Sequence, residues 1–326
     1  MSQKLLITGG AGFIGSVLTA YLLDHRYEVV VLDDLSTGHS KSIDSRASLI
    51  QASIFDKSAL VAALVGVNTV IHCAAKSLVE ESVSSPDLYN QVNTEGTGVL
   101  LEAMKEAGVS NIIFSSTAAV YGDSKIQPIT ESSEIKPVNP YGKSKIEAER
   151  LISTFCSNGF SGITFRYFNV AGSYHSSSGQ LHIEDHRNET HLIPKILNNY
   201  IKNKEKSQVE IYGDHWPTKD GSCVRDYLHV VDLAHAHLFA LDALAAGENK
   251  VFNLGSGSGY SVFEVVNEIE KVVGGKLNQV ITPARSGDPA VLLADIDKAI
   301  KELGWFPKAN LNQIILDSWQ GAKQLG

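Results

Sequence analysis

LLITGGAGFIG, residues 5–15, contains the strongest indication of the fold. A short apolar run leads into glycines at positions 9, 12 and 15, and a helical pattern follows directly. The GxxGxxG spacing permits a tight turn, a backbone that a pyrophosphate can approach, and close packing of the helix against the strand. The start of a helix also offers free N–H groups and a positive dipole end to an anion. We therefore predict that a dinucleotide binds at Gly9, Gly12, Phe13, Ile14 and Gly15.

The first half of the chain alternates short β-rich runs with amphipathic stretches. Apolar residues recur at helical spacing in residues 14–22 and 148–155. The β-rich runs are mostly apolar at consecutive positions, which is typical of parallel strands covered on both faces. This alternation predicts an α/β fold, a doubly wound parallel sheet of the Rossmann type with right-handed crossovers. The predicted strands are residues 5–8, 28–33, 49–52, 69–73, 111–115 and 163–168.

The pattern changes after Asn169. Residues 171–190 are rich in Ser, His and Gly and are predicted to form a loop over a site, and residues 282–288 are predicted to form another loop before a helical tail. Residues 209–212 have a strand pattern, and residues 250–254 could return to the main sheet. We expect a Rossmann domain in residues 1–170, rejoined by about 220–255, and a smaller C-terminal α/β substrate region in residues 171–220 and 256–326.

Composition excludes several classes of protein. The 28 Lys and Arg against 36 Asp and Glu give a formal charge of 28 − 36 = −8, which argues against general affinity for nucleic acids or anionic membranes. Cys73, Cys156 and Cys223 are scattered and without CxxC spacing, so they predict neither a disulfide framework nor a zinc site. No apolar run is long enough to cross a bilayer or to act as a signal peptide, so we expect a cytoplasmic protein.

The second predicted strand ends at Asp33, 18 residues after Gly15. A carboxylate there accepts hydrogen bonds from the adenosine ribose hydroxyls and repels a 2′-phosphate. Without the glycines, Asp33 and Asp34 would indicate only a turn at the end of a strand. With them, Asp33 favours NAD over NADP, and Asp34 is expected to be solvated.

A catalytic group is predicted where Tyr141 and Lys145 lie four residues apart at the start of a helix after Pro140. A nearby ammonium and a bound nicotinamide cation would lower the phenol's pKa from about 10, so that Tyr141 could take a proton. Thr117 follows the fifth strand, at the edge of the sheet where ligands bind, and its hydroxyl could bond the reacting oxygen. The alternative is an exposed helix face, because this spacing also occurs by chance.

Together, the glycine loop, the Ser-Ser-Thr strand end and YGKSK (residues 141–145) resemble the extended short-chain dehydrogenase/reductase superfamily. Within it, residues 165–169 (FRYFN), 224–229 (VRDYLH) and 285–288 (RSGD) are similar to UDP-glucose 4-epimerases. The resemblance implies an isomerase, usually a homodimer, that holds NAD tightly. Hydride would pass from sugar C4 to NAD⁺ and return to the opposite face of a transient 4-keto sugar.

The resemblance also implies a role for individual residues. Tyr141 would be the base, Lys145 would hold the nicotinamide ribose, and Thr117 would bind the 4-oxygen. Arg225 and Arg285 would grip the diphosphate of the UDP-sugar, which suits planar guanidinium groups. Asn169 would contact the UDP-sugar, and Asp288 would accept from the uridine ribose. The cofactor residues also include Ile54, Asn93 and Phe168, and the substrate residues also include Leu192 and Tyr212.

The chain departs from the family pattern at several positions. Ala52-Ser53-Ile54 lacks the Asp that often holds adenine, so the backbone of Ile54 or Asp56 is expected to substitute. An Asn-Asn pair is replaced by Thr190-His191-Leu192. Leu292 falls near the C2 group of the sugar and is intermediate in size, which leaves sugar specificity open. No metal site is predicted, because the spacing of His175, His182, His186 and His191 matches no zinc pattern and favours a solvated loop.

Rival functions are weighed by the same residues. Dehydratases and decarboxylases carry acidic residues after the strand-end Thr, where this chain has Ala118 and Ala119, and methyl groups cannot move protons. A 4-epimerase for UDP-GlcNAc, a UDP-pentose or UDP-glucuronate remains open. A non-catalytic NAD-sensing protein has no reason to keep Thr117, Tyr141 and Lys145 together. A dehydrogenase that releases NADH would differ in cofactor retention.

Overall fold

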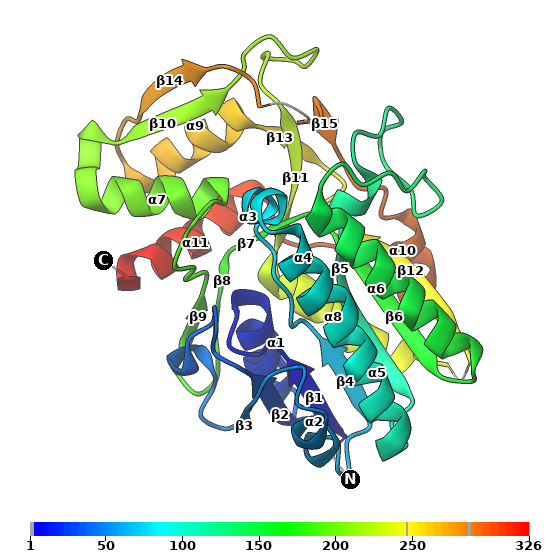
Figure 1. Ribbon diagram of the computed structural model, residues 1–326. Coiled ribbons are helices and arrows are strands. Elements are labelled where there is room, and N and C mark those ends of the chain that lie inside the picture. Colours follow the sequence, from blue (N-terminus) through cyan, green and yellow to red (C-terminus); the bar gives the residue numbers. More distant parts are fainter. Residues whose placement is uncertain (1–2, 246, 286–287, 326) are drawn as a thin grey trace.

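The computed structural model describes residues 3–245, 247–285 and 288–325. Its centre is a seven-stranded parallel sheet, which confirms the predicted doubly wound α/β fold (Figure 1). The predicted strands of the first half are confirmed, with ends that differ by at most two residues. In spatial order the sheet contains β12 (Asn249–Leu254), β6 (Ser161–Tyr167), β5 (Asn111–Thr117), β4 (Thr69–His72), β1 (Lys4–Thr8), β2 (Glu28–Asp33) and β3 (Ser48–Gln51).

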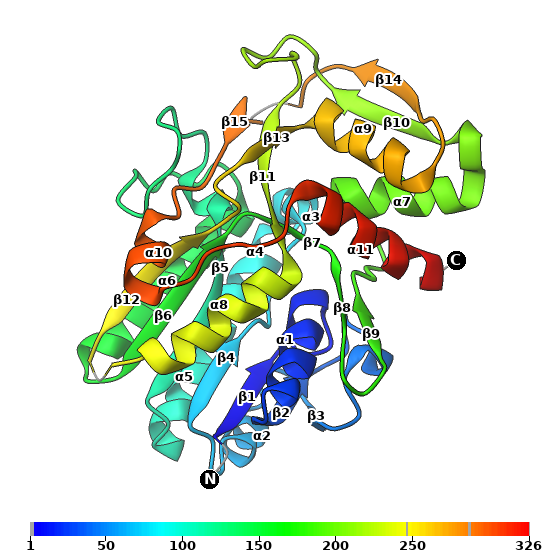
Figure 2. The same ribbon diagram turned by 180° about the vertical axis from the view of Figure 1, so that it is seen from behind.

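Helices cover both faces of this sheet, as the continuous apolar strands require. In β1, Leu5 and Ile7 contribute to the core on one face, whereas Leu6 contributes to the core on the other. The first face is covered by α1 (Phe13–Asp24), α8 (Val230–Ala243) and α10 (Asp297–Leu303), and the second by α2 (Lys57–Ala63), α5 (Gly96–Ala107) and α6 (Pro140–Ser157) (Figures 1 and 2).

The strand order reverses between β1 and β4. From β1 the chain moves outward to β2 and β3, and it then returns to the other side of β1 to form β4, β5 and β6. Loops leave the carboxyl ends of β1 and β4 in opposite directions at such a switch point, so that a crevice opens there for a ligand. The glycine loop, Asp33 and Thr117 all lie at this edge.

A smaller C-terminal region lies above the carboxyl ends of the strands (Figure 1). Its own core includes Leu197, Val265 and Ile315, all fully buried. The predicted strand at 209–212 is confirmed within β10. The region is built from α7 (Leu192–Asn203), β10 (Gln208–Tyr212), α9 (Val262–Val273), β14 (Asn278–Thr282) and α11 (Leu311–Leu325).

One strand connects the sheet edge with this region. Tyr227 to His229 of β11 (Val224–His229) pair with β7 (Asn169–Ala171), while its first residues pair with β13 (Gly259–Ser261) and β15 (Val291–Leu292). The chain returns to the sheet core at β12 and again at α10. Trp305, just after α10, is fully buried in this core. The domain boundaries near 170, 220 and 255 stay a prediction.

The prediction of a plain loop at 171–190 is wrong. Residues Ser173–His175 (β8) and Leu181–Ile183 (β9) form an antiparallel hairpin. The hairpin is ordered by contacts that are distant in sequence: Tyr174 donates to Asp24 Oδ2 (2.6 Å), and Ser173 donates to the carbonyl of Asp317 (2.9 Å). Such polar sequences form strands where neighbouring elements supply partners, which the local pattern does not reveal.

The remaining short elements connect the layers. In the described part of the chain, no helix is long and apolar enough to cross a membrane. The short helical segments are η1 (Ser40–Ser42), α3 (Val79–Ser84), α4 (Pro86–Tyr89), η2 (Asn90–Glu95), η3 (Ala118–Tyr121) and η4 (Lys204–Lys206).

Candidate active site

Two of the three loop glycines are required by the packing of the protein itself. Gly9 has φ +74°, and a Cβ there would lie 2.6 Å from the backbone nitrogen of Ala74. A Cβ on Gly15 would collide with the carbonyl oxygen of Gly9. These two glycines therefore allow the tight turn and the close approach of α1 to the end of β1.

Gly12 is different, because the protein leaves space beside it. A Cβ there would meet only the Gly9 carbonyl oxygen, at an ordinary contact distance of 3.5 Å. Gly12 is also the N-cap of α1 and provides no side-chain cap, and the N–H groups of Phe13 and Ile14 in the first turn lack intrahelical acceptors. Open space next to these donors fits a pyrophosphate that approaches the backbone.

Asp33 supports the glycine loop from the end of β2. Its Oδ2 accepts from the Ala11 N–H (2.9 Å) and its Oδ1 from the Leu35 N–H (2.8 Å). Burial raises the pKa of Asp33, and these two hydrogen bonds oppose that effect. Each carboxylate oxygen keeps a further lone pair, so Asp33 can order the loop and still accept from a ribose hydroxyl.

Tyr141 and Thr117 come together because α6 begins beside the end of β5. The Asn139 side chain caps the helix by accepting from the Gly142 N–H (2.8 Å). A Cβ on Gly142 would lie 2.6 Å from the carbonyl oxygen of Ala119, so α6 starts directly against η3. This close contact brings the phenol of Tyr141 near the Thr117 hydroxyl, which lowers the pKa of the phenol.

The predicted lowering of the Tyr141 pKa depends on Lys145 together with a bound nicotinamide cation, so it stays a prediction. Burial raises the pKa of Tyr141 to about 12, and the Thr117 hydroxyl opposes this only in part. The Lys145 ammonium donates instead to the carbonyl of Ser115 (2.8 Å) and lies 4.8 Å from the centroid of the Phe114 ring. Burial also lowers the pKa of Lys145 to about 8. A bound cation beside the phenol would oppose the effect of burial.

Asn93 connects residue 76 with Ser144, the residue before Lys145. Its amide donates to the Lys76 carbonyl (2.9 Å) and to Ser144 Oγ (2.9 Å), and its Oδ1 accepts from the Lys76 N–H (2.8 Å). Both amide hydrogens are thus used within the protein. The structure places Asn93 where it positions α6 and residue 76.

The polar groups of residues 53–56, where adenine is predicted to bind, are mostly hydrogen-bonded within the protein. Ser53 Oγ accepts from the Phe55 N–H (3.2 Å), and the Asp56 carboxylate caps α2 by accepting from Ala59 (3.0 Å). The Asp56 N–H donates to the Ser53 carbonyl (2.9 Å). The two expected substitutes were the backbones of Ile54 and Asp56. Asp56 takes part in these bonds, whereas the backbone of the buried Ile54 does not.

A buried charged network joins α6, β6, η3 and β12, and the sequence analysis did not predict it. Arg166 Nη2 donates to Glu149 Oε2 (2.6 Å), and Arg166 Nη1 donates to the hydroxyl of Tyr121 (3.0 Å). That hydroxyl in turn donates to Asn253 Oδ1 (2.7 Å), which joins β12 to the network. Two signals were present: an Arg inside an apolar strand, and a Glu one helical turn after Lys145.

The predicted diphosphate residues are brought together from three separate segments. The Arg285 guanidinium lies 3.9 Å from the centroid of the Tyr212 ring, and Arg225 Nη2 lies 3.7 Å from Asp288 Oδ1. Arg225 is held by the carbonyls of Val224 and Pro289, at 2.8 and 2.9 Å. Residues 286–287 of the predicted motif lie outside the described residues.

Three further predicted substrate residues lie around this group. Leu292 pairs in register with Arg225 across β11 and β15. Asn169, in β7, donates to the carbonyl of Asp226 (3.1 Å), and Phe168 beside it is buried next to Leu292. Leu192 is the first residue of α7. Arg225, Leu292 and Asn169 are thus brought near one another around β11 from separate parts of the sequence.

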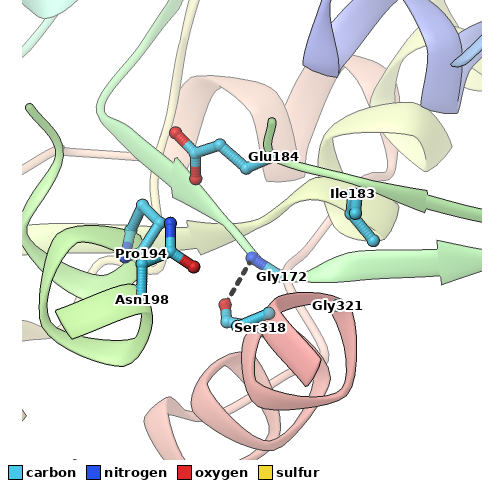
Figure 3. A pocket seen from close by; sticks show the side chains of 8 residues that line it. Gly172, Ile183, Glu184, Pro194, Asn198, Ser318 and Gly321 are labelled. Carbon is cyan, nitrogen blue, oxygen red and sulfur yellow. Dashed lines mark hydrogen bonds between the residues drawn. The ribbon is translucent and has the colours of Figure 1, made fainter. Parts of the chain in front are cut away.

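The expectation of a solvated histidine loop is wrong in part, because His175 and His191 are exposed but His182 is buried and His186 is half-buried. Glu184, His186, Glu189 and His191 form one half-buried cluster between β9 and α7. Burial disfavours the charged imidazoles, but the carboxylates outweigh it and raise the pKa of His186 to about 9 and that of His191 to about 10. Glu184 also lines a small pocket with α7 and α11, away from the sheet edge (Figure 3).

A family model described as the NAD dependent epimerase/dehydratase family matches residues 5–255. The chain belongs to this family. The UDP-glucose 4-epimerase of Corynebacterium glutamicum is 43% identical, over 99% of this chain and 97% of that protein. Membership in a family of NAD-dependent enzymes is thus confirmed, as is the resemblance to UDP-glucose 4-epimerases.

Two solved structures are similar over nearly the whole chain. One is the UDP-glucose-4-epimerase of Stenotrophomonas maltophila with bound NAD and formylated UDP-arabinopyranose, with a TM-score of 0.93, 32% identity, and coverage of 99% of this chain and 98% of that chain. The other is the UDP-glucose 4-epimerase of Bifidobacterium longum in complex with NAD⁺ and UDP, with a TM-score of 0.91, 34% identity and the same coverage. These likenesses confirm the Rossmann-type fold of the epimerases.

Proposed function

We propose that this chain is an NAD-dependent epimerase that interconverts UDP-glucose and UDP-galactose at C4. The observation that carries the proposal is the position of Thr117, Tyr141 and Lys145. They lie at the carboxyl edge of the sheet, with the phosphate-binding glycine loop on the same edge and the arginines of the C-terminal region above it. The named epimerases at 43% identity and with bound NAD and UDP support the same activity.

The cofactor is held by the residues whose surroundings fit it. The loop at Gly9, Gly12 and Gly15 takes the pyrophosphate, Asp33 takes the adenosine ribose, and Lys145 takes the nicotinamide ribose. When bound, NAD supplies reversible hydride transfer at the sugar C4. Its positive ring is the additional cation that the phenol of Tyr141 needs for a lower pKa.

The protein's own residues move the proton. Tyr141 takes the proton of the sugar 4-hydroxyl and later gives it back, as a general base and then a general acid. Thr117 holds the 4-oxygen beside the phenol. Once the 4-keto sugar has turned over in the site, bound NAD would supply hydride to its other face, so that there would be no net oxidation and the cofactor would stay bound.

The UDP portion anchors the substrate while the sugar turns. Arg225 and Arg285 neutralise the diphosphate, and Asp288 accepts from the uridine ribose. Asn169, Leu192 and Tyr212 line the same space. Leu292, in register with Arg225, faces the C2 side of the sugar and leaves UDP-GlcNAc, UDP-pentose or UDP-glucuronate as the second candidate substrates. Among these three, the formylated UDP-arabinopyranose bound to the Stenotrophomonas relative favours a UDP-pentose.

The chain acts in the cytoplasm as a homodimer. The three cysteines are free thiols, in keeping with a reducing compartment. Val79 and Val83 on α3 are 44% and 67% exposed and provide apolar surface for a second copy. The units that bind the two ligands are residues 1–170 with 220–255, and residues 171–220 with 256–326.

The test is to mix purified protein with UDP-galactose, without added NAD, and to follow the sugar by proton NMR. Conversion to an equilibrium mixture with UDP-glucose supports the proposal and shows that cofactor was retained. Tyr141→Phe, matched in size, is the control and should bind UDP without conversion. No conversion by protein that holds NAD would contradict this substrate and favour another UDP-sugar, which the same assay identifies.

A further inference from the structure

A second candidate site lies where β9 ends and α7 begins, directly before Leu192 of the proposed substrate site. Glu184, His186, Glu189 and His191 come from eight consecutive residues, and His191 is the N-cap of α7. In Figure 3 the Glu184 carboxylate points to the side of Pro194, in the first turn of α7. The neighbouring Asp185 turns to Lys41 (3.1 Å) and stays outside the group.

The four side chains bring their ligand atoms close together, and one atom from each lies within 4.8 Å of the others. His186 Nδ1 lies 3.4 Å from Glu184 Oε1 and 3.1 Å from Glu189 Oε2. His191 Nδ1 lies 2.8 Å from Glu184 Oε1 and 3.1 Å from Glu189 Oε1. Four ligands arranged tetrahedrally about an ion at about 2.0 Å lie about 3.3 Å from one another, so atoms that are now up to 4.8 Å apart would move closer by up to about 1.5 Å.

Without a metal, ion pairs hold the cluster together, but its short contacts outnumber the hydrogens on the two Nδ1 atoms. Each Nδ1 carries at most one hydrogen but faces oxygens of both carboxylates, and that hydrogen can point at only one of them. The carboxylates are also shielded, since the Glu184 and Glu189 side chains are 6% and 11% exposed. A divalent cation at the centre would displace the protons of the two imidazoles and contact all four groups, and its charge would then equal that of the two carboxylates.

We propose that Glu184, His186, Glu189 and His191 bind one divalent transition-metal ion of the zinc type. Two imidazoles and two carboxylates are ligands that zinc accepts, whereas Mg²⁺ and Ca²⁺ prefer oxygen alone. Because four protein ligands leave no open position, the ion has a structural role. It joins the end of the β8–β9 hairpin to the start of α7, which carries Leu192.

The experiment uses the whole chain with its bound cofactor, freed of metal with EDTA and desalted. Isothermal titration with ZnCl₂, and metal analysis after gel filtration, should give one zinc per chain. MgCl₂ should give no binding. His191→Ala and Glu189→Gln should each weaken zinc binding by at least about 100-fold, since even the loss of a supporting contact to a ligand costs 10–100-fold.

His215→Ala is the matched control, because His215 is 93% exposed and lies outside the cluster. It should bind zinc as the unchanged protein does. Glu189→Gln keeps the size of the side chain, so it remains informative if His191→Ala fails to fold, and cofactor retention monitors folding in each case. Failure of the unchanged protein to bind zinc would overturn the proposal, and so would equal binding by the folded cluster variants.

Discussion

The buried ion pair behind the candidate site leads to a quantitative stability prediction. Arg166 in β6 donates to Glu149 in α6 through Nε (3.0 Å) and Nη2 (2.6 Å), and both side chains are 7% exposed. Removing one partner leaves a buried charge without compensation, which costs about 3–5 kcal/mol. Glu149→Leu is therefore expected to lower the free energy of unfolding by about 3–5 kcal/mol.

The same loss can be expressed as a change in melting temperature. An unfolding entropy of about 2.1 cal/mol/K per residue gives about 0.7 kcal/mol/K for 326 residues, so the midpoint should fall by about 4–7 °C. Thermal unfolding followed by circular dichroism measures this shift. The NAD concentration must be the same for every variant, because a bound ligand raises the melting temperature by itself.

A double-mutant cycle decides whether the pair is the cause. Glu149→Leu with Arg166→Met removes both charges, so the double variant should be at least about 2 kcal/mol more stable than the sum of the single losses implies. Glu147→Leu is the control on the same helix, because Glu147 pairs with Arg150 on the exposed surface and should matter far less. Single losses that add to within about 0.5 kcal/mol would refute the reasoning.

Three further predictions concern the loop, the proton and acid unfolding. Gly12→Ala should reduce the unfolding free energy by less than about 1 kcal/mol but weaken NAD retention at least about tenfold, whereas Gly15→Ala should reduce both; equal melting curves for the two variants would contradict the packing argument. Tyr141→Phe should lower turnover by about 10²–10⁴-fold in the NMR assay with UDP affinity kept, and turnover near that of the unchanged protein would exclude Tyr141 as the base. Although burial raises the pKa of Asp24, hydrogen bonds from Ser177 and Tyr174 hold it at about 2, so its stabilisation is present above the ordinary carboxyl pKa of about 3.9 and is lost as the pH falls toward 2. Urea midpoints between pH 4 and pH 2.5 should therefore fall less steeply for Asp24→Asn, and parallel curves would contradict this.

Local features of the sequence were sufficient for the sheet and for one half of the site. Consecutive apolar residues predicted the buried parallel strands, because a strand covered on both faces has no polar side. The order of strand, glycines and helix predicted the phosphate loop, and Asp33 followed from its place at the end of the second strand. These features depend on neighbours in the chain, which is why the strand ends agree to within two residues.

Local patterns were insufficient wherever the partner of a side chain is distant in the sequence. The hairpin in residues 171–190 exists because Asp24 and Asp317 supply its hydrogen bonds. Likewise, the spacing of Tyr141 and Lys145 gave no information on where the ammonium points. Ser115, 30 residues away, accepts its hydrogen bond, and burial by the surrounding fold raises the pKa of Tyr141 in the absence of a bound cation.

The sequence by itself thus determined the class of fold, the phosphate loop and the candidate catalytic residues, since each follows from patterns among neighbouring residues. Only the tertiary structure decided how Arg225, Arg285 and Tyr212 meet, why Glu149 and Arg166 are buried together, and that two carboxylates and two imidazoles gather before α7. The physical reason is that hydrogen bonds, desolvation and charge pairing act over a few ångströms in space, whatever the separation along the chain.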